Sequence, residues 1–129
     1  MPILFLNVET VLQIHENQIA LYGGDATVRD QSLLKSAIAM PEQAFGGQFL
    51  HEFPFGMAAA YCFHLVSNHP FVDGNKRTGF ASSLAFLDLN ELRLAADRDS
   101  GYEMVLKVAR GEMPKADVLE FYRRHVVPK

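Results

Sequence analysis

Apolar residues recur at helical spacing along most of the chain, a pattern typical of amphipathic helices. Polar caps and breakers divide the pattern into segments: Asn7 and Asp30 can each cap a helix, and Pro41 stops the second one. The sequence Ser100-Gly101-Tyr102-Glu103 has the form of a capping box and predicts the start of a fifth helix. The predicted helices span about residues 8–22, 31–40, 56–68, 76–89, 100–111 and 114–126.

These segments predict an all-α fold, a compact bundle of about six helices. The segment 56–68 is rich in alanine and apolar on several sides, so we expect it to form the central helix. Leu92-Arg93-Leu94 favours a short extended piece. Because 129 residues with 49% hydrophobic content can bury one core of ordinary size, we expect a single domain over residues 1–129.

Charge and cysteine content narrow the classes of function. The net charge of −3 argues against direct nucleic-acid binding, since proteins that track phosphate backbones usually carry a basic surface. The sequence has no apolar run of about 18 residues and no charged-then-apolar leader, so we expect a cytoplasmic protein without a membrane partner. The single Cys62 excludes an internal disulfide and is more simply a buried small side chain than a reactive thiol.

The most informative segment is His69-Pro70-Phe71-Val72-Asp73-Gly74-Asn75-Lys76-Arg77-Thr78-Gly79, which joins the third and fourth predicted helices. Pro70 disfavours helical backbone in the residue before it, so the third helix should stop near His69. Asp73-Gly74-Asn75 predicts a turn, after which the backbone N–H groups of residues 74–77 are unpaired at a helix start. Such N–H groups, at the positive end of a helix dipole, attract phosphate.

The side chains of this segment supply the chemistry that a nucleotide phosphate needs. His69 is the natural general base, since imidazole both accepts and donates protons near neutral pH. Asp73 is a hard oxygen ligand for Mg²⁺, which usually takes one or two protein carboxylates plus phosphate oxygens. Lys76 and Arg77 supply positive charge. Taken singly, each residue also has a structural interpretation, with Asp73 or Asn75 as a helix cap and the two cations as solvated surface charge.

In this order the segment resembles the Fic motif, His-Pro-Phe-x-Asp/Glu-Gly-Asn-Gly/Lys-Arg, and specifically its Doc (death-on-curing) branch. The similarity extends along most of the chain, in the order typical of Doc sequences. The resemblance implies a Fic/Doc-like helical fold with a flap loop before the central helix. The flanking segments that resemble Doc are 12–16 (LQIHE), 21–24 (LYGG), 29–34 (RDQSLL), 45–47 (FGG) and 84–90 (LAFLDLN).

Two departures from most Fic sequences favour kinase chemistry over AMP transfer. AMP-transferring relatives carry Gly where this chain has Lys76, and they carry a second Arg, which holds the outer phosphates, where it has Phe80. Without that arginine, the resemblance implies that ATP binds reversed, with its γ-phosphate at the acceptor. The implied acceptor is a Thr or Ser hydroxyl on a translation protein, with elongation factor Tu expected, whose phosphorylation blocks growth. AMP transfer to a protein hydroxyl is the alternative.

Carried over to this chain, the resemblance implies a role for each residue of the motif. His69 takes the proton of the acceptor hydroxyl, and Asp73 holds Mg²⁺ against the phosphates of ATP. Gly74 and Asn75 form the anion-binding turn. Lys76 and Arg77 bind the phosphates and neutralise charge on the transferred group. In physical terms this is phosphoryl transfer by positioning and electrostatics.

The resemblance also implies a protein partner. Self-inhibited Fic proteins contain a Ser/Thr-x-x-x-Glu-Gly/Asn helix, but the only Glu followed by Gly or Asn here is Glu16, and Leu12 stands four residues before it. A chain without this inhibitory element suits a toxin restrained by a separate antitoxin. In Doc-like systems that partner is a Phd-type antitoxin whose disordered tail folds on binding.

Several features of the sequence are open to more than one interpretation. His15 lies on the apolar face of the first helix, where a hydrogen-bonded core histidine is favoured over a catalytic one. The aromatic-rich loop 45–55 is either a connection whose phenylalanines fold back on the core or the flap that holds a target segment. Gly79 marks close approach of a ligand or a neighbouring helix, or simple drift. The other function classes are an inactive Fic-fold binding module and a metal-dependent hydrolase using His64, His69 and Asp73.

Overall fold

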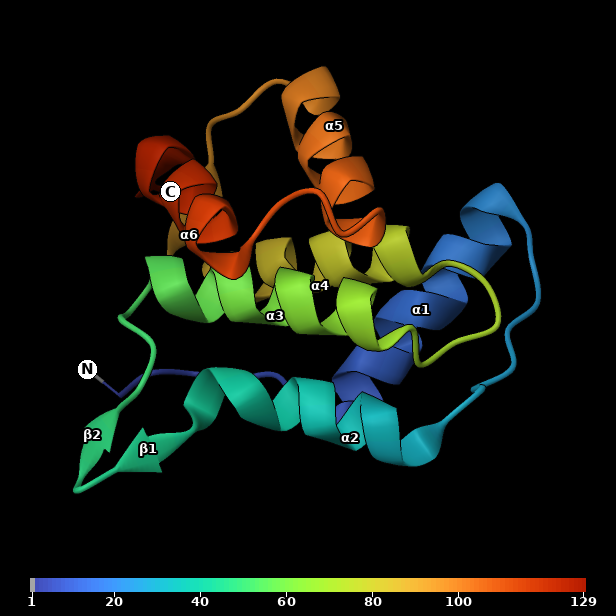
Figure 1. Ribbon diagram of the computed structural model, residues 1–129, viewed down its shortest axis with the longest axis horizontal. Helices are drawn as coiled ribbons and strands as arrows, with labels where there is room; N and C mark the ends of the chain where they lie inside the picture. The colour runs from blue at the N-terminus through green and yellow to red at the C-terminus, as the bar shows by residue number, and fades with distance from the viewer. Residues whose placement is uncertain (1) are drawn as a thin grey trace.

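Six α-helices make up most of the chain in the computed structural model, which describes residues 2–129 (Figure 1). The predicted all-α fold, a compact bundle of about six helices, is confirmed. A 3₁₀ turn follows the second helix, and two short antiparallel strand pairs lie outside the bundle. The helices are α1 Val8–Tyr22, α2 Gln31–Ala39, α3 Phe55–Asn68, α4 Asn75–Leu89, α5 Arg98–Ala109 and α6 Lys115–His125, and the strand pairs are β1 Ala44–Phe45 with β2 Gln48–Phe49 and β3 Leu92–Leu94 with β4 Val126–Pro128.

Helix α3 occupies the centre of the bundle, as its apolar composition predicts. It runs beside α4, with α2 on one side and α5 and α6 on the other, while α1 packs against α4 (Figure 1). None of the helices described is long and apolar enough to cross a membrane. This arrangement places the two ends of α3 in different surroundings: its last residues meet the start of α4 beside α1, and its first residues lie near α6 and the hairpin β1–β2.

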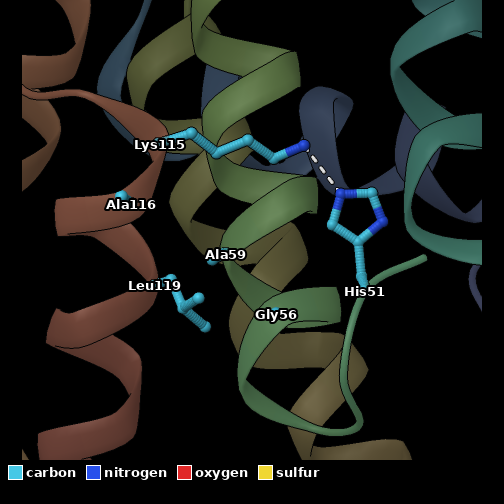
Figure 2. A pocket seen from close by; sticks show the side chains of 6 residues that line it. All are labelled: His51, Gly56, Ala59, Lys115, Ala116 and Leu119. Atoms are coloured by element: carbon cyan, nitrogen blue, oxygen red, sulfur yellow. Dashed lines mark hydrogen bonds between the residues drawn. The ribbon is translucent and has the colours of Figure 1, made fainter.

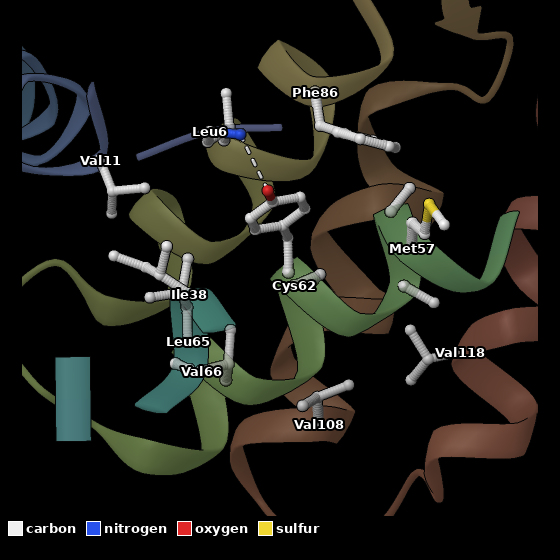
Figure 3. Close-up of a cluster of buried hydrophobic side chains, with 14 of the residues drawn as sticks. Leu6, Val11, Ile38, Met57, Cys62, Leu65, Val66, Phe86, Val108 and Val118 are labelled. Carbon is white, nitrogen blue, oxygen red and sulfur yellow. Dashed lines mark hydrogen bonds between the residues drawn. The ribbon is translucent and has the colours of Figure 1, made fainter. Parts of the chain in front are cut away.

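The core is built around the buried side chains of α3, which cluster with buried residues from each of the other five helices (Figure 3). The Tyr61 hydroxyl accepts a hydrogen bond from the backbone N–H of Leu6 at 2.9 Å, so the polar tip of this buried ring is satisfied. Cys62 is fully buried, and burial raises the pKa of its thiol to about 12. The thiol is therefore protonated and packs as a small apolar group, as the sequence predicts.

Most helix starts follow the predicted caps, but one prediction is wrong. The side chains of Asn7 and Asp30 accept hydrogen bonds from the backbone N–H groups at the starts of α1 and α2. The fifth helix begins at Arg98 rather than at the predicted capping box. Asp97 caps it by accepting from the Ser100 N–H at 2.7 Å, so Ser100 lies inside the first turn and cannot itself be the cap.

Two helix ends can be compared with the prediction. α2 ends at Ala39, within one residue of the predicted end at Met40, and Pro41 lies in the 3₁₀ turn Met40–Glu42 that follows it. α6 ends at His125, because Val126 begins a strand that pairs with Leu92–Leu94. The extended piece at Leu92–Leu94 is confirmed, and its partner strand begins at Val126, the last residue that the sequence assigns to the sixth helix.

Gly79 lies in a tight contact between α4 and α3. A Cβ atom at this position would lie 2.7 Å from Cγ2 of Val66 and 3.1 Å from the carbonyl oxygen of Cys62. Of the interpretations for this glycine, close approach of a neighbouring helix therefore accounts for it. The contact fixes the C-terminal half of α3 against the start of α4, which is the junction that carries the Fic-like segment.

Candidate nucleotide phosphate site

The Fic-like segment forms a tight loop between α3 and α4. α3 ends at Asn68 and is capped by His69, whose backbone is left-handed (φ 50°, ψ 53°), and Gly74 precedes α4 with a φ of 82°. Glycine suits this second position because left-handed backbone costs it little. The first hydrogen bond of α4 runs from the Thr78 N–H to the Gly74 carbonyl, which leaves the amides of residues 75–77 outside the helical ladder.

A cavity of about 260 Å³ opens over this helix start, and we call it the motif cavity. One side of it is polar and comes from the loop and the first residues of α4, and the other side is apolar. His69 lines this cavity and is exposed. The lining residues are Val66, His69, Val72, Asp73, Gly74, Asn75, Lys76 and Ala109.

Asn75 holds the loop in shape through its buried side-chain amide. Its Oδ1 accepts from the Phe71 N–H at 2.9 Å, and its Nδ2 donates to the Phe71 carbonyl at 2.9 Å and to Nδ1 of His69 at 3.0 Å. The Phe71 N–H can only donate, so it fixes which end of the amide is oxygen. Nδ1 of His69 is therefore an acceptor, and the neutral imidazole carries its proton on Nε2.

His15 braces the same loop from α1. Its side chain is only 1% exposed, and its ring stacks on Phe71 with centroids 3.7 Å apart and planes 7° apart. Its Nε2 lies 2.8 Å from the carbonyl oxygen of Asp73, which requires the proton on Nε2. His15 is thus a hydrogen-bonded core histidine, the interpretation favoured from the sequence, but its partner belongs to the motif.

This contact orients one peptide group at the motif cavity. In a trans peptide the C=O and N–H bonds point in opposite directions. Because the Asp73 carbonyl points to His15 in the interior, the N–H of Gly74 points away from His15, and Gly74 is one of the residues that line the motif cavity. His15 therefore positions a backbone donor at the place where the sequence predicts anion binding.

The structure brings most, but not all, of the predicted charged residues to the motif cavity. Lys76 is exposed and lines it. Asp73 also lines it, and its Oδ2 accepts from the Asp25 N–H at 2.8 Å, which holds the carboxylate at the cavity edge. Arg77 turns the other way: it donates to the Gly23 carbonyl at 3.1 Å and lies 5.1 Å over the Tyr22 ring. To make its predicted phosphate contact, the Arg77 side chain would have to leave the Gly23 carbonyl and the Tyr22 ring.

Arg29 also supports the loop, although its residue type alone did not single it out in the sequence. It donates from Nε to the His69 carbonyl at 2.8 Å and from its terminal nitrogen to the Asn68 carbonyl at 3.2 Å. A cation at the C-terminus of a helix binds the unpaired carbonyls there. Arg29 falls within the 29–34 stretch that resembles Doc, which was the available signal.

The hydrolase interpretation is not supported by this geometry. His64 does not join His69 and Asp73, because its Nε2 lies 2.8 Å from Nζ of Lys115 on α6. Within residues 2–129 no group of three His, Cys, Asp or Glu side chains converges. The donor set at the motif cavity, one carboxylate beside unpaired amides and a lysine, fits a cation that is shared with the oxygens of a bound phosphate.

The fold and cavity together define a helical protein with a polar cavity at a helix junction, lined by an exposed histidine and one carboxylate. The sequence pattern of the Fic/DOC family matches residues 5–87, more than half of the chain and the whole motif, so this chain belongs to the Fic/DOC family.

Two relatives place the chain near Doc proteins. It is 42% identical over 78 residues to Toxin Doc of Mycolicibacterium smegmatis, an alignment that covers 60% of this chain and 60% of that toxin. It is 25% identical over 119 residues to Protein kinase doc of Escherichia phage P1, covering 92% of this chain and 93% of that protein.

Proposed function

We propose that this chain is the toxin of a toxin–antitoxin pair and transfers the γ-phosphoryl group of ATP to a Thr or Ser hydroxyl on a translation protein. The observation that carries the proposal is the motif cavity, where the exposed His69, the Asp73 carboxylate and Lys76 surround the unpaired amides of a helix start. The names of the two relatives, a toxin and a protein kinase, support it. Elongation factor Tu is the expected target, and a Phd-type antitoxin is the expected partner.

Phe80 supports phosphoryl transfer over AMP transfer. A Cβ at Gly101 of α5 would lie 2.7 Å from Cζ of Phe80, so the phenylalanine ring packs into the contact between α4 and α5. The position that carries an outer-phosphate arginine in AMP-transferring relatives is therefore an apolar packing position here. Nothing from this position on α4 holds the outer phosphates, which suits a nucleotide bound with its γ-phosphate toward His69.

The roles of the remaining residues follow from where they lie. The amides of residues 74–77 and Lys76 bind phosphate oxygens at the start of α4. Asp73 would hold Mg²⁺, which neutralises developing negative charge during transfer. Arg77 would add a second cation on leaving the Gly23 carbonyl. Catalysis of this kind needs positioning and charge and forms no covalent enzyme intermediate.

His69 has to change its proton arrangement to act as the base. With Nδ1 bonded to Asn75, the outward Nε2 carries the proton and can only donate. The exposed ring can turn over about its Cβ–Cγ bond and exchange its proton with water, which gives the tautomer with a bare Nε2. In that tautomer Nε2 accepts the proton of the acceptor hydroxyl as the oxygen attacks the γ-phosphorus.

Two labelled nucleotides test the proposal directly. The protein is incubated with purified elongation factor Tu, and separately with a bacterial lysate, in the presence of Mg²⁺ and either γ-labelled or α-labelled ATP. We expect label on protein from the γ position only. Label from the α position would show AMP transfer instead, and label from neither position, in both mixtures, would leave a binding module as the function.

A further inference from the structure

A second cavity lies at the opposite end of α3, between α3, α6 and the segment that follows hairpin β1–β2 (Figure 2). Its volume is about 290 Å³, and we call it the lysine cavity. It shares no lining residue with the motif cavity. Gly56 and Ala59 of α3 form one wall, Ala116 and Leu119 of α6 form the other, and His51 and Lys115 meet at one end.

Lys115 reaches across α3 and is held between two histidines. Its Nζ lies 2.7 Å from Nε2 of His51 and 2.8 Å from Nε2 of His64. Burial lowers the pKa of the Lys115 ammonium below its ordinary value near 10.5. As an ammonium Lys115 has only donors, so both Nε2 atoms accept, and both rings are neutral with their protons on Nδ1. Burial and the neighbouring ammonium lower the pKa values of His51 and His64, in the latter case to about 4, which agrees with two neutral rings.

The ammonium is hydrogen-bonded, but its charge is not balanced by a protein carboxylate. Within residues 2–129 no Asp or Glu forms an ion pair with Lys115. Glu52, next to His51 in the sequence, is already paired with Arg123 at 2.7 Å. Partly buried charges are usually paired, and here the two imidazoles use two of the three N–H groups of Lys115. One donor and one positive charge are left for a ligand.

The walls restrict the ligand further. Gly56, Ala59, Ala116 and Leu119 offer small apolar surface and no charged group, so they suit a short aliphatic body. A single cation flanked by neutral acceptors matches one negative charge better than the two charges of a phosphate. A metal ion is disfavoured because the ammonium already occupies the point where the two Nε2 atoms converge.

We propose that the lysine cavity binds a carboxylate on a short aliphatic stem, with Lys115 pairing the carboxylate and Ala59, Ala116 and Leu119 packing on the stem. Two sources offer this chemistry: a free small carboxylic acid and a glutamate side chain of a polypeptide. The site is separate from the motif cavity, so it stands whether or not the chain transfers phosphate.

Nuclear magnetic resonance titration of the imidazole ring nitrogens tests the proposal at pH 7.5. The protein is titrated with butyrate and with its uncharged counterpart butyramide, and in a second arm with acetyl-Ala-Glu-Ala-amide and the corresponding Gln peptide. We expect saturable shifts of the His51 and His64 signals with both carboxylates, with a Kd on the order of 1 mM, and none with the amides. Tighter binding of the Glu peptide assigns a polypeptide source, and tighter binding of butyrate assigns a free acid.

Matched variants make the result decisive. Lys115→Met should weaken carboxylate binding by about tenfold or more, while Lys35→Met, which removes the same charge from an exposed position on α2, should not. Ala116→Leu, at an exposed cavity position, narrows the site with the cluster intact and should weaken binding even if Lys115→Met folds poorly. Equal shifts with butyrate and butyramide, or equal losses in the two lysine variants, would overturn the proposal.

Discussion

The two cavities at the ends of α3 are built in different ways. The motif cavity comes almost entirely from one continuous stretch, residues 66–76, whose backbone is held by the Asn75 amide and by His15. The lysine cavity is assembled from three separate parts of the chain, with His51, His64 and Lys115 meeting only because the helices pack. The first presents backbone donors in fixed positions, whereas the second presents one side-chain charge.

This difference predicts which substitutions and which pH changes affect each cavity. We expect that the proposed chemistry at the motif cavity can be removed without disturbing the fold, because His69 is exposed. The lysine cavity depends on protonation states and on the contact of α6 with α3, so pH changes should affect it. The four predictions below test this separation, from the largest expected effect to the smallest.

His69→Ala should reduce phosphoryl transfer by about 10²- to 10⁴-fold, the usual contribution of a general base. The urea midpoint should stay close to that of the parent protein, because the ring is exposed and its main contact is one hydrogen bond from Asn75. His125→Gln, on the last turn of α6, is the matched control and should retain activity. Unchanged transfer in His69→Ala would remove the base assignment.

Gly79→Ala should destabilise the protein by about 1–3 kcal/mol, the usual cost of overpacking a tight contact. The added methyl group would overlap Val66 and approach the Cys62 carbonyl, which forces α3 and α4 apart beside the motif cavity. Urea unfolding measures the loss. Because Gly56 and Ala59 lie at the other end of α3, carboxylate binding by the folded variant should persist, and parallel loss of both functions would contradict the separation.

His15→Phe and His15→Gln divide the two contacts of this side chain. Phenylalanine keeps the stack on Phe71 and loses the donor to the Asp73 carbonyl, while glutamine keeps a donor and loses the stack. If His15 orients the Gly74 amide, His15→Phe should raise the KM for ATP by about tenfold with a smaller change in kcat, the cost of one misplaced charge-assisted hydrogen bond. Partial recovery in His15→Gln would support the orienting role, and equal KM values in all three proteins would argue against it.

The pH dependence of protein stability should show the contribution of the neutral His64 ring beside the lysine cavity. The pKa of His64 is about 4 in the folded protein against an ordinary 6.5, chiefly through burial and secondly through Lys115 and His51. The unfolded chain therefore binds more protons between pH 6.5 and 4, and stability contributed by the neutral ring is lost as pH falls through this window. We expect about 1 kcal/mol, because the ring is partly exposed and its charge is screened.

Urea midpoints at pH 7.5 and 5.0 measure this effect. His64→Gln, whose amide oxygen can also accept from Lys115, should lose less stability over the same pH change than the parent protein. Equal pH dependence in the two proteins would show that His64 is protonated at pH 5 in the folded state or contributes nothing.

Sequence reasoning succeeded where the determinants are local. The caps at Asn7 and Asp30, the stop at His69 and the helix start after Gly74 each depend on neighbouring residues, and the structure has them where they were predicted. The start of α5 was missed because Asp97 and Ser100 both qualify as caps, and only the structure shows that Asp97 accepts from the Ser100 N–H.

The features that the sequence could not predict are contacts between distant residues. The pairing of β3 with β4 joins positions more than thirty residues apart and shortens the last helix. Packing likewise determines three contacts at the cavities. His15 bonds the Asp73 carbonyl, and Arg77 bonds the Gly23 carbonyl instead of facing the motif cavity. Three basic side chains meet at the lysine cavity. In loop 45–55, Phe49 and Phe53 contact Phe5 and Phe86, as the core-packing interpretation predicts, whereas Phe45 is 81% exposed on the hairpin. The role of this loop as a flap stays a prediction.

Because Cys62 is fully buried in the central helix, its reaction with a thiol reagent can report when the helix bundle opens. It is the only cysteine in the sequence, so a thiol reagent has one possible target. A thiol with no exposed surface and a strongly raised pKa reacts only after the central helix separates from its neighbours. Alkylation rates would therefore measure how often the bundle opens, in cells as well as in the test tube, without a label that disturbs either cavity.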